Sequence, residues 1–142
     1  MGFDRTFIDP EWGAATAATL TAGGADVIFG AGGTTGNGAV IGAAEAGVYA
    51  IGVDTDQYHT LPEARGSMLS SALKLITPGV FELIELAMAG GFNGGDFIGR
   101  VGYAPFHEVA AEVPAAVKTT MEEIRTALLD GSLATGVPPA KN

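Results

Sequence analysis

The stretch ADVIFGAGGTTGNGAVIGAAEAGVYAIGVDTDQ, residues 25–57, decides the fold class of this chain. It contains two short apolar runs, residues 27–29 and 48–53, bounded by Gly and Asp residues. Such runs are typical of strands that are buried on both faces of a parallel sheet. A glycine-rich loop at 30–38 and an alanine-rich helix at 39–46 are predicted between them. Strand, helix and strand form a right-handed βαβ crossover, so the sequence predicts an α/β fold with a parallel sheet.

Polar residues follow both predicted strands. The carboxyl ends of adjacent parallel strands are where open α/β sheets bind small ligands. Thr34, Thr35 and Asn37 place hydroxyl and amide groups before the predicted helix, where backbone N–H groups favour polar ligands. The unit therefore predicts a binding edge, although a flexible strand-to-helix turn explains the glycines equally simply.

The glycine-rich segment does not match a nucleotide-binding fingerprint. Counted from Gly30, the last glycine of G-x-G-x-x-G is replaced by Thr35. Counted as a P-loop from Gly33, the required lysine is replaced by Ala39. These two mismatches argue against an enzyme that binds phosphate groups in a glycine-rich loop.

Asp54 and Lys74 are the charged residues with the clearest candidate roles. A carboxylate at the end of a strand accepts hydrogen bonds from vicinal hydroxyls, as sugar recognition requires, but Asp54 and Asp56 also suit an Asx turn. Lys74 is the single charged residue of SMLSSALKLI, residues 67–76. Its ammonium group is expected to reach water, to donate to a ligand hydroxyl, or to pair with Asp54.

The sequence gives little support for a metal site or for enzyme activity. His59 and His107 lack the short spacing of a zinc site, so each is expected to be a surface or loop residue and no metal or cofactor is predicted. No serine lies in a G-x-S-x-G elbow, and no pair of nucleophile and base is visible, so the chain is not expected to be an enzyme. Phe7 and Trp12 are expected to pack in the core or to stack on a flat ligand.

The rest of the chain is predicted to continue the α/β order as one domain, residues 1–142. Pro10 and Asp9 predict the start and the N-cap of a helix, and Thr77 is the expected cap of a later one. The predicted segments are a helix at 10–22, a polar loop at 54–66, an extended segment at 67–74, a helix at 78–89, a turn at 90–95, a strand within 97–103, a mostly helical segment at 107–130 interrupted near Pro114, and a flexible tail at 131–142.

Composition excludes several classes of protein. The 142 residues are 47% hydrophobic, which is enough for a folded core. A net charge of -9 with only 7 Lys and Arg residues argues against a nucleic-acid surface. There is no Cys, so disulfides, thiolate metal sites and a lipid-anchor cysteine are all absent from the sequence. No apolar run approaches the roughly 20 residues of a membrane span, and no signal peptide is recognised.

Several motifs, in order, resemble one family. The quoted stretches are TFIDPEWG, ADVIFGAGGTTGNG, AAEAGVYAIGVDTDQ, SMLSSALKLITPGVFELIELAMAGGF and GRVGYAPF. Together they resemble the basic membrane protein family of substrate-binding lipoproteins of ABC transporters, which includes purine-nucleoside receptors. The resemblance implies a type I periplasmic-binding fold, with a parallel doubly wound sheet, of which this chain is a single lobe: the second, later half.

The resemblance also implies a site. Asp54 and Lys74 match the positions that hold ribose hydroxyls, Phe7 matches the aromatic residue that packs on the base, and Gly33 matches the glycine loop. The implied partners are a purine nucleoside, an ABC transporter permease and, because the first lobe is missing, further copies of the chain in a homo-oligomer. The implied location is extracytoplasmic.

Two functions from different classes follow. The first is a nucleoside-binding module of an ABC-type uptake system, without catalysis, in half-length form. The alternative is a structural, oligomerising α/β domain that keeps the fold but has lost ligand binding.

Overall fold

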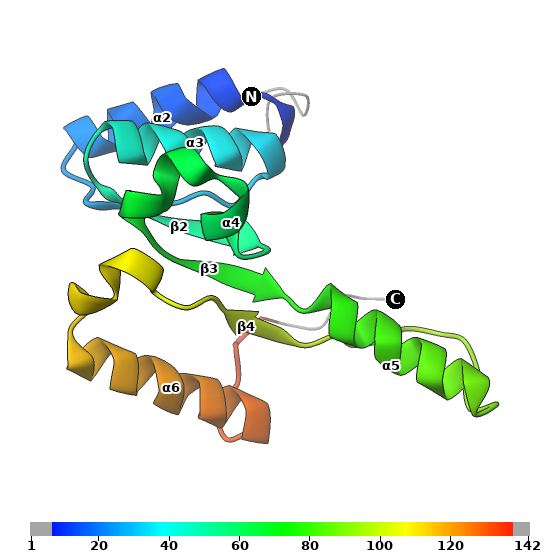
Figure 1. Ribbon diagram of the computed structural model, residues 1–142. Coiled ribbons are helices and arrows are strands. Elements are labelled where there is room, and N and C mark those ends of the chain that lie inside the picture. The colour runs from blue at the N-terminus through cyan, green and yellow to red at the C-terminus, as the bar shows by residue number, and fades with distance from the viewer. Residues whose placement is uncertain (1–6, 138–142) are drawn as a thin grey trace. The chain divides into compact units, whose positions relative to one another are not determined.

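The computed structural model describes residues 7–137 (Figure 1). The chain divides into two compact units, Met1–Ala110 and Ala111–Asn142. The first unit holds the sheet and the helices that pack on it, and the second holds helix α6 (Ala115–Asp130). Pro114 is the N-cap of α6, which confirms the predicted interruption, and Gly131 ends the helix in the left-handed conformation at φ 77°.

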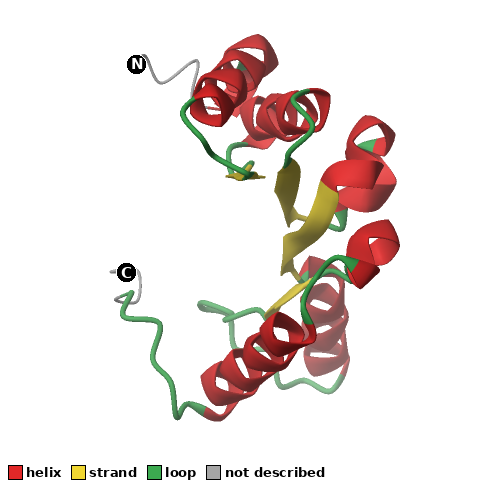
Figure 2. Cartoon of the chain, turned by 90° about the vertical axis from the view of Figure 1, so that its left-hand side faces the viewer, coloured by secondary structure: helices red, strands yellow, loops and turns green. Residues whose placement is uncertain are grey.

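Among the described residues the sheet has four strands, in the order β1-β2-β3-β4 (Figure 2). They are β1 (Val27–Phe29), β2 (Tyr49–Asp54), β3 (Met68–Lys74) and β4 (Val101–Tyr103). β1, β2 and β3 are parallel neighbours, as predicted, and β4 adds an antiparallel edge beside β3. The α/β class and the mostly parallel sheet are thus confirmed. The strand predicted within residues 97–103 is present as β4, but its antiparallel direction was not predicted.

Helix α2 (Pro10–Ala22) begins as predicted. The Asp9 carboxylate accepts a hydrogen bond of 2.9 Å from the Trp12 N–H, which confirms Asp9 as the N-cap. α2 packs against α3 (Gly33–Glu45), the crossover helix between β1 and β2.

Helix α3 begins at Gly33 and not at Ala39, so the predicted loop over residues 33–38 is wrong. The glycines of this segment serve close packing instead. A Cβ atom on Gly38 would overlap the Pro10 carbonyl, and one on Gly13 would overlap the Thr35 carbonyl. The two helices therefore approach backbone to backbone, which only glycine permits at these positions.

Two further boundaries differ from the sequence predictions. The polar segment at 54–66 folds into α4 (Gln57–Thr60) and the 3₁₀-helix η1 (Pro62–Ser67). Helix α5 (Ile76–Met88) has Leu75 as its N-cap, so the prediction of Thr77 as the cap is wrong. Pro78 lies in the first turn of α5, where its missing N–H breaks no intrahelical bond.

The core of the first unit lies between the crossover helices and the sheet. Most of its buried side chains are small, and Met68 is the largest fully buried one. The cluster consists of Ala17, Ile28, Val40, Ala43, Ala50, Leu61, Ala64 and Met68. Within residues 7–137, no helix combines the length and the apolar character needed to cross a membrane.

Candidate functional site

Asp54 and Lys74 form an ion pair at the carboxyl ends of two neighbouring parallel strands. Asp54 ends β2 and Lys74 ends β3, and the Lys74 Nζ lies 2.7 Å from the Asp54 Oδ1. The side chains are 64% exposed for Lys74 and 51% for Asp54. The pairing that the sequence left open is therefore present, and both groups remain accessible to a ligand.

The backbone at Asp54 holds an uncommon conformation. Its φ of 70° lies in the left-handed region, which Asp and Asn adopt more readily than other non-glycine residues. This conformation turns the chain at the end of β2 toward α4. Such left-handed residues cluster at binding and active sites, so Asp54 is a candidate on backbone grounds as well as charge.

The ion pair faces an open pocket of about 450 Å³. A volume of this order lies within the usual range of small-molecule binding pockets. The pocket is lined by Asp54, Thr55, Asp56, Leu73, Lys74, Leu75, Ile76, Thr77 and Pro78.

Phe7 and Gly33 form a second pair of predicted site residues that the fold brings together. Gly33 begins α3 with φ 58°, and a Cβ atom there would lie 2.8 Å from the Phe7 carbonyl oxygen. The Thr34 hydroxyl donates a hydrogen bond of 3.0 Å to that same carbonyl. Phe7 itself is half exposed.

The polar groups expected to bind ligand from the glycine-rich segment bind within the protein. Thr35 is buried and its hydroxyl accepts a hydrogen bond of 2.9 Å from the Asp9 N–H. Asn37 accepts one of 2.8 Å from the Gln57 side chain. These groups hold the start of α2, α3 and α4 together, so they position the edge of the sheet.

Gln57 is a buried connecting residue that sequence reasoning did not single out. Its Oε1 accepts a hydrogen bond of 3.1 Å from the Val53 N–H, and its own N–H donates to the Ser71 hydroxyl at 3.1 Å. With the bond to Asn37, Gln57 joins β2, β3 and α3 just behind the turn at Asp54. A single glutamine that follows the aspartates at the end of β2 belongs to no sequence motif, so this role could not be predicted from the residues around it.

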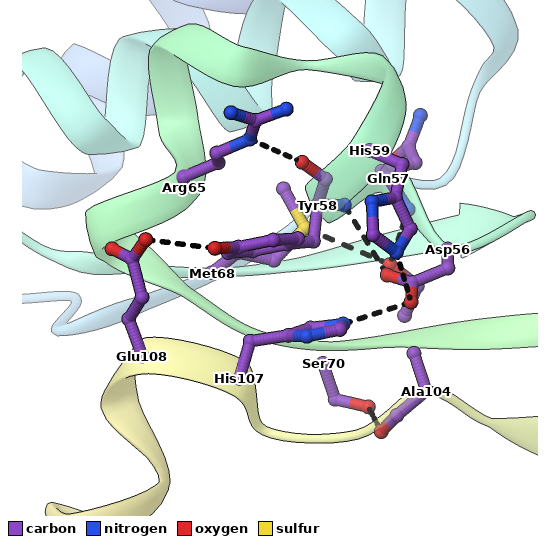
Figure 3. Close-up of polar contacts among 11 residues, drawn as sticks. Asp56, Gln57, Tyr58, His59, Arg65, Met68, Ser70, Ala104, His107 and Glu108 are labelled. Atoms are coloured by element: carbon purple, nitrogen blue, oxygen red, sulfur yellow. Dashed lines mark hydrogen bonds and ion pairs between the residues drawn. The ribbon is translucent and has the colours of Figure 1, made fainter.

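The structure also brings His107 together with Asp56 and His59, which lie about 50 residues earlier in the sequence (Figure 3). One oxygen of Asp56 accepts a hydrogen bond from the Tyr58 N–H and caps α4, which bears out a structural role for one of the two aspartates. Tyr58 stacks on His107 and donates to Glu108 at 2.7 Å, and this hydrogen bond raises the pKa of the Tyr58 phenol.

Solved structures with the same fold come from transport and regulatory proteins. A solute-binding protein of an ABC transporter system from Aeropyrum pernix K1 aligns at TM-score 0.74 with 22% identity, over 94% of this chain and 46% of that one. A solute-binding protein from Conexibacter woesei DSM 14684 aligns at 0.71 with 20% identity, over 93% and 43%. A transcriptional activator of the comK gene from Bacillus halodurans aligns at 0.73 with 20% identity, over 93% and 45%.

These likenesses confirm the periplasmic-binding-protein-like fold, and the chain spans less than half the length of each of the three structures. The family model for ABC transporter substrate-binding proteins of the PnrA-like type, Bmp, matches residues 4–100. That match covers the parallel strands β1, β2 and β3, the ion pair at Asp54 and Lys74, and helix α5, and it ends just before β4. The chain therefore belongs to the Bmp family of ABC transporter substrate-binding proteins.

Proposed function

We propose that this chain is a non-catalytic ligand-binding module of an ABC-type uptake system and that its ligand is a purine nucleoside. The observation that carries the proposal is the exposed Asp54–Lys74 pair beside an open pocket, at the carboxyl ends of β2 and β3. This is the edge at which open α/β sheets bind small molecules.

The pair has the chemistry that a ribose requires. The Asp54 carboxylate accepts two hydrogen bonds from vicinal hydroxyls, and the Lys74 ammonium donates to a hydroxyl oxygen. An exposed ion pair contributes only about 0–1 kcal/mol to stability, so a ligand displaces it at little cost. Phe7 supplies a ring to pack on the base, and the backbone at Gly33 allows close approach.

The site is open on one side. Binding sites for small molecules bury most of the ligand surface, and the solved relatives carry more than twice the length that this chain covers. We infer that a second lobe or a second copy of the chain supplies the remaining contacts. The permease of an ABC transporter and an extracytoplasmic location follow from family membership as further parts of the proposal.

Calorimetric titration with inosine, guanosine and adenosine tests the proposal. The expected result is heat of binding with at least one of them and a large loss of affinity for its 2′,3′-dideoxy analogue, which lacks the hydroxyls that Asp54 is proposed to bind. Absence of heat with all three nucleosides, on a folded sample across the range of its assembly states, would contradict the nucleoside assignment.

A second candidate function is a structural, oligomerising domain that has lost ligand binding. The observation that favours it is helix α5, which has no buried residue among those described although it is rich in apolar side chains. A helix apolar on most sides is normally covered by other protein. One similar fold belongs to a transcriptional activator, which shows that the fold is not confined to transport proteins. Self-association without any nucleoside binding would favour this alternative.

A further inference from the structure

Asp56, His59 and His107 converge on one carboxylate oxygen. The His107 Nε2 lies 2.8 Å from the Asp56 Oδ2, and the His59 Nε2 lies 3.7 Å from the same oxygen. One ligand atom from each of the three residues falls within 4.8 Å of the others. The residues come from the start of α4 and the start of η2 (His107–Ala111), which the fold brings side by side (Figure 3).

The spacing suits a small tetrahedral ion. Two ligands bound about 2.0–2.1 Å from a tetrahedral zinc lie roughly 3.4 Å apart. The two distances to the Asp56 Oδ2, 2.8 and 3.7 Å, fall on either side of that value. The two imidazole nitrogens lie within 4.8 Å of each other, so small movements of the side chains bring all three atoms around one ion.

The surrounding contacts orient the ligand groups. The Asp56 Oδ1 is engaged by the Tyr58 N–H at 3.3 Å, so the Oδ2 is directed at the imidazoles. The His107 ring stacks on the Tyr58 ring with centroids 3.9 Å apart and planes 14° apart. Arg65 lies 5.2 Å from the Tyr58 ring centroid and also donates to the Tyr58 carbonyl at 2.8 Å. Partners that fix ligand orientation in this way increase metal affinity.

An ion has a path to the cluster. Asp56 and His107 are mostly buried, with side chains 22% and 18% exposed, whereas the His59 side chain is 66% exposed. An ion entering from solvent meets His59 first and leaves one coordination position for water.

We propose that Asp56, His59 and His107 bind one divalent transition-metal ion of the zinc class. Two imidazole nitrogens favour Zn²⁺ and its neighbours over Mg²⁺ and Ca²⁺, which prefer oxygen ligands. The bound ion links His107 to a partner 51 residues earlier in the sequence. Because the unfolded chain does not hold these residues together, the ion stabilises the folded first unit. This site adjoins the pocket beside the Asp54–Lys74 pair, since Asp56 also lines that pocket, but the proposed metal binding does not depend on nucleoside binding.

The test uses the full chain, freed of metal with a chelator, and titrates it with Zn²⁺ by calorimetry. The expected result is one Zn²⁺ per chain, a rise of several degrees in the thermal midpoint, and no comparable rise with Mg²⁺. With Co²⁺, the visible absorption of a four-coordinate site is expected.

Three variants and a control identify the ligands. His59→Ala, His107→Asn and Asp56→Asn are each expected to weaken Zn²⁺ binding at least tenfold. Asn keeps the N-cap at position 56 and tolerates the φ of 43° at His107, so these changes separate coordination from folding. The matched control is Asp26→Asn, which removes an exposed carboxylate elsewhere in the first unit and is expected to change nothing.

His59→Ala decides the outcome if another variant does not fold, because the exposed His59 side chain adds little to the core. Zn²⁺ affinity unchanged in His59→Ala would overturn the proposal. An equal thermal shift with Mg²⁺, or Zn²⁺ binding lost equally in Asp26→Asn, would also overturn it, because either result indicates general attraction to an acidic surface.

Discussion

The side chain of Gln57 donates a hydrogen bond of 2.8 Å to the Asn37 Oδ1 and thereby joins the segment after β2 to the glycine-rich helix α3. Gln57 is also the acceptor for the Val53 N–H. The turn that presents Asp54 is therefore supported from behind by a buried amide. The candidate site depends on this support as well as on Asp54 and Lys74, which line the pocket.

Gln57→Leu is expected to destabilise the first unit. Leucine has a similar volume but leaves the partly buried Val53 N–H and Asn37 Oδ1 without their partner. A fully buried unsatisfied group costs about 1–3 kcal/mol, so the expected loss is at most of that order for each of the two groups. Chemical denaturation measures the free energy of unfolding. The control is Thr19→Ala, which removes an exposed hydroxyl bond in α2 and is expected to change that free energy by less than about 0.5 kcal/mol. Equal effects of the two changes would show that Gln57 has no connecting role.

Gly38→Ala is expected to lower the free energy of unfolding by about 1–3 kcal/mol, the usual range for overpacking. The added methyl group would overlap the Pro10 carbonyl and force α2 away from α3. Gly66→Ala is the matched control, because a Cβ atom at Gly66 has no atom within 4 Å. That control is expected to be neutral or slightly stabilising, and a stable Gly38→Ala protein would argue that α2 and α3 do not pack as closely as described.

Asp54→Asn is expected to weaken nucleoside binding by about 1.5–3 kcal/mol, the range for hydrogen bonds to a charged group. Asparagine tolerates the φ of 70° and keeps the shape of the side chain, so the change isolates the charge. Lys74→Met is expected to reduce affinity as well, and calorimetry measures both. Asp26→Asn serves as the control for loss of one exposed carboxylate. Full affinity in Asp54→Asn would remove Asp54 from the proposed ribose site.

Phe81→Glu is expected to abolish self-association of the chain. Phe81 is 63% exposed on α5, and a charge there opposes burial of this helix against a second copy. Light scattering at several protein concentrations measures the molecular mass. Leu20→Glu introduces the same charge at a 51% exposed position on α2 and is expected to leave association unchanged. A wild-type chain that stays monomeric at every concentration would contradict the proposed homo-oligomer.

Several elements could be predicted because their causes are local. Asp9 and Pro10 mark the start of α2 through one hydrogen bond and one fixed dihedral angle. The apolar runs that became β1 and β2 are recognisable from their composition and from the Gly and Asp residues around them. The prediction that both strands are buried on both faces is wrong for β1, where Val27 and Phe29 are exposed. The pairing of Asp54 with Lys74 was among the predicted alternatives, since both residues end strands on the same edge.

Other features could not be predicted, because they depend on which distant segments approach one another. The start of α3 at Gly33 is set by close contact with α2, and the same glycines would equally suit a loop. His107 reaches Asp56 only because the segment after β4 returns beside the start of α4.

The sequence by itself determined the α/β class, the crossover unit and the positions of Asp54 and Lys74 at the ends of two strands. Short-range patterns of apolar residues and helix caps are enough to fix these features. The tertiary structure alone decided the use of the glycines, the antiparallel direction of β4 and the cluster of Asp56, His59 and His107. These features arise from contacts between residues far apart in the chain, and no local pattern encodes such contacts.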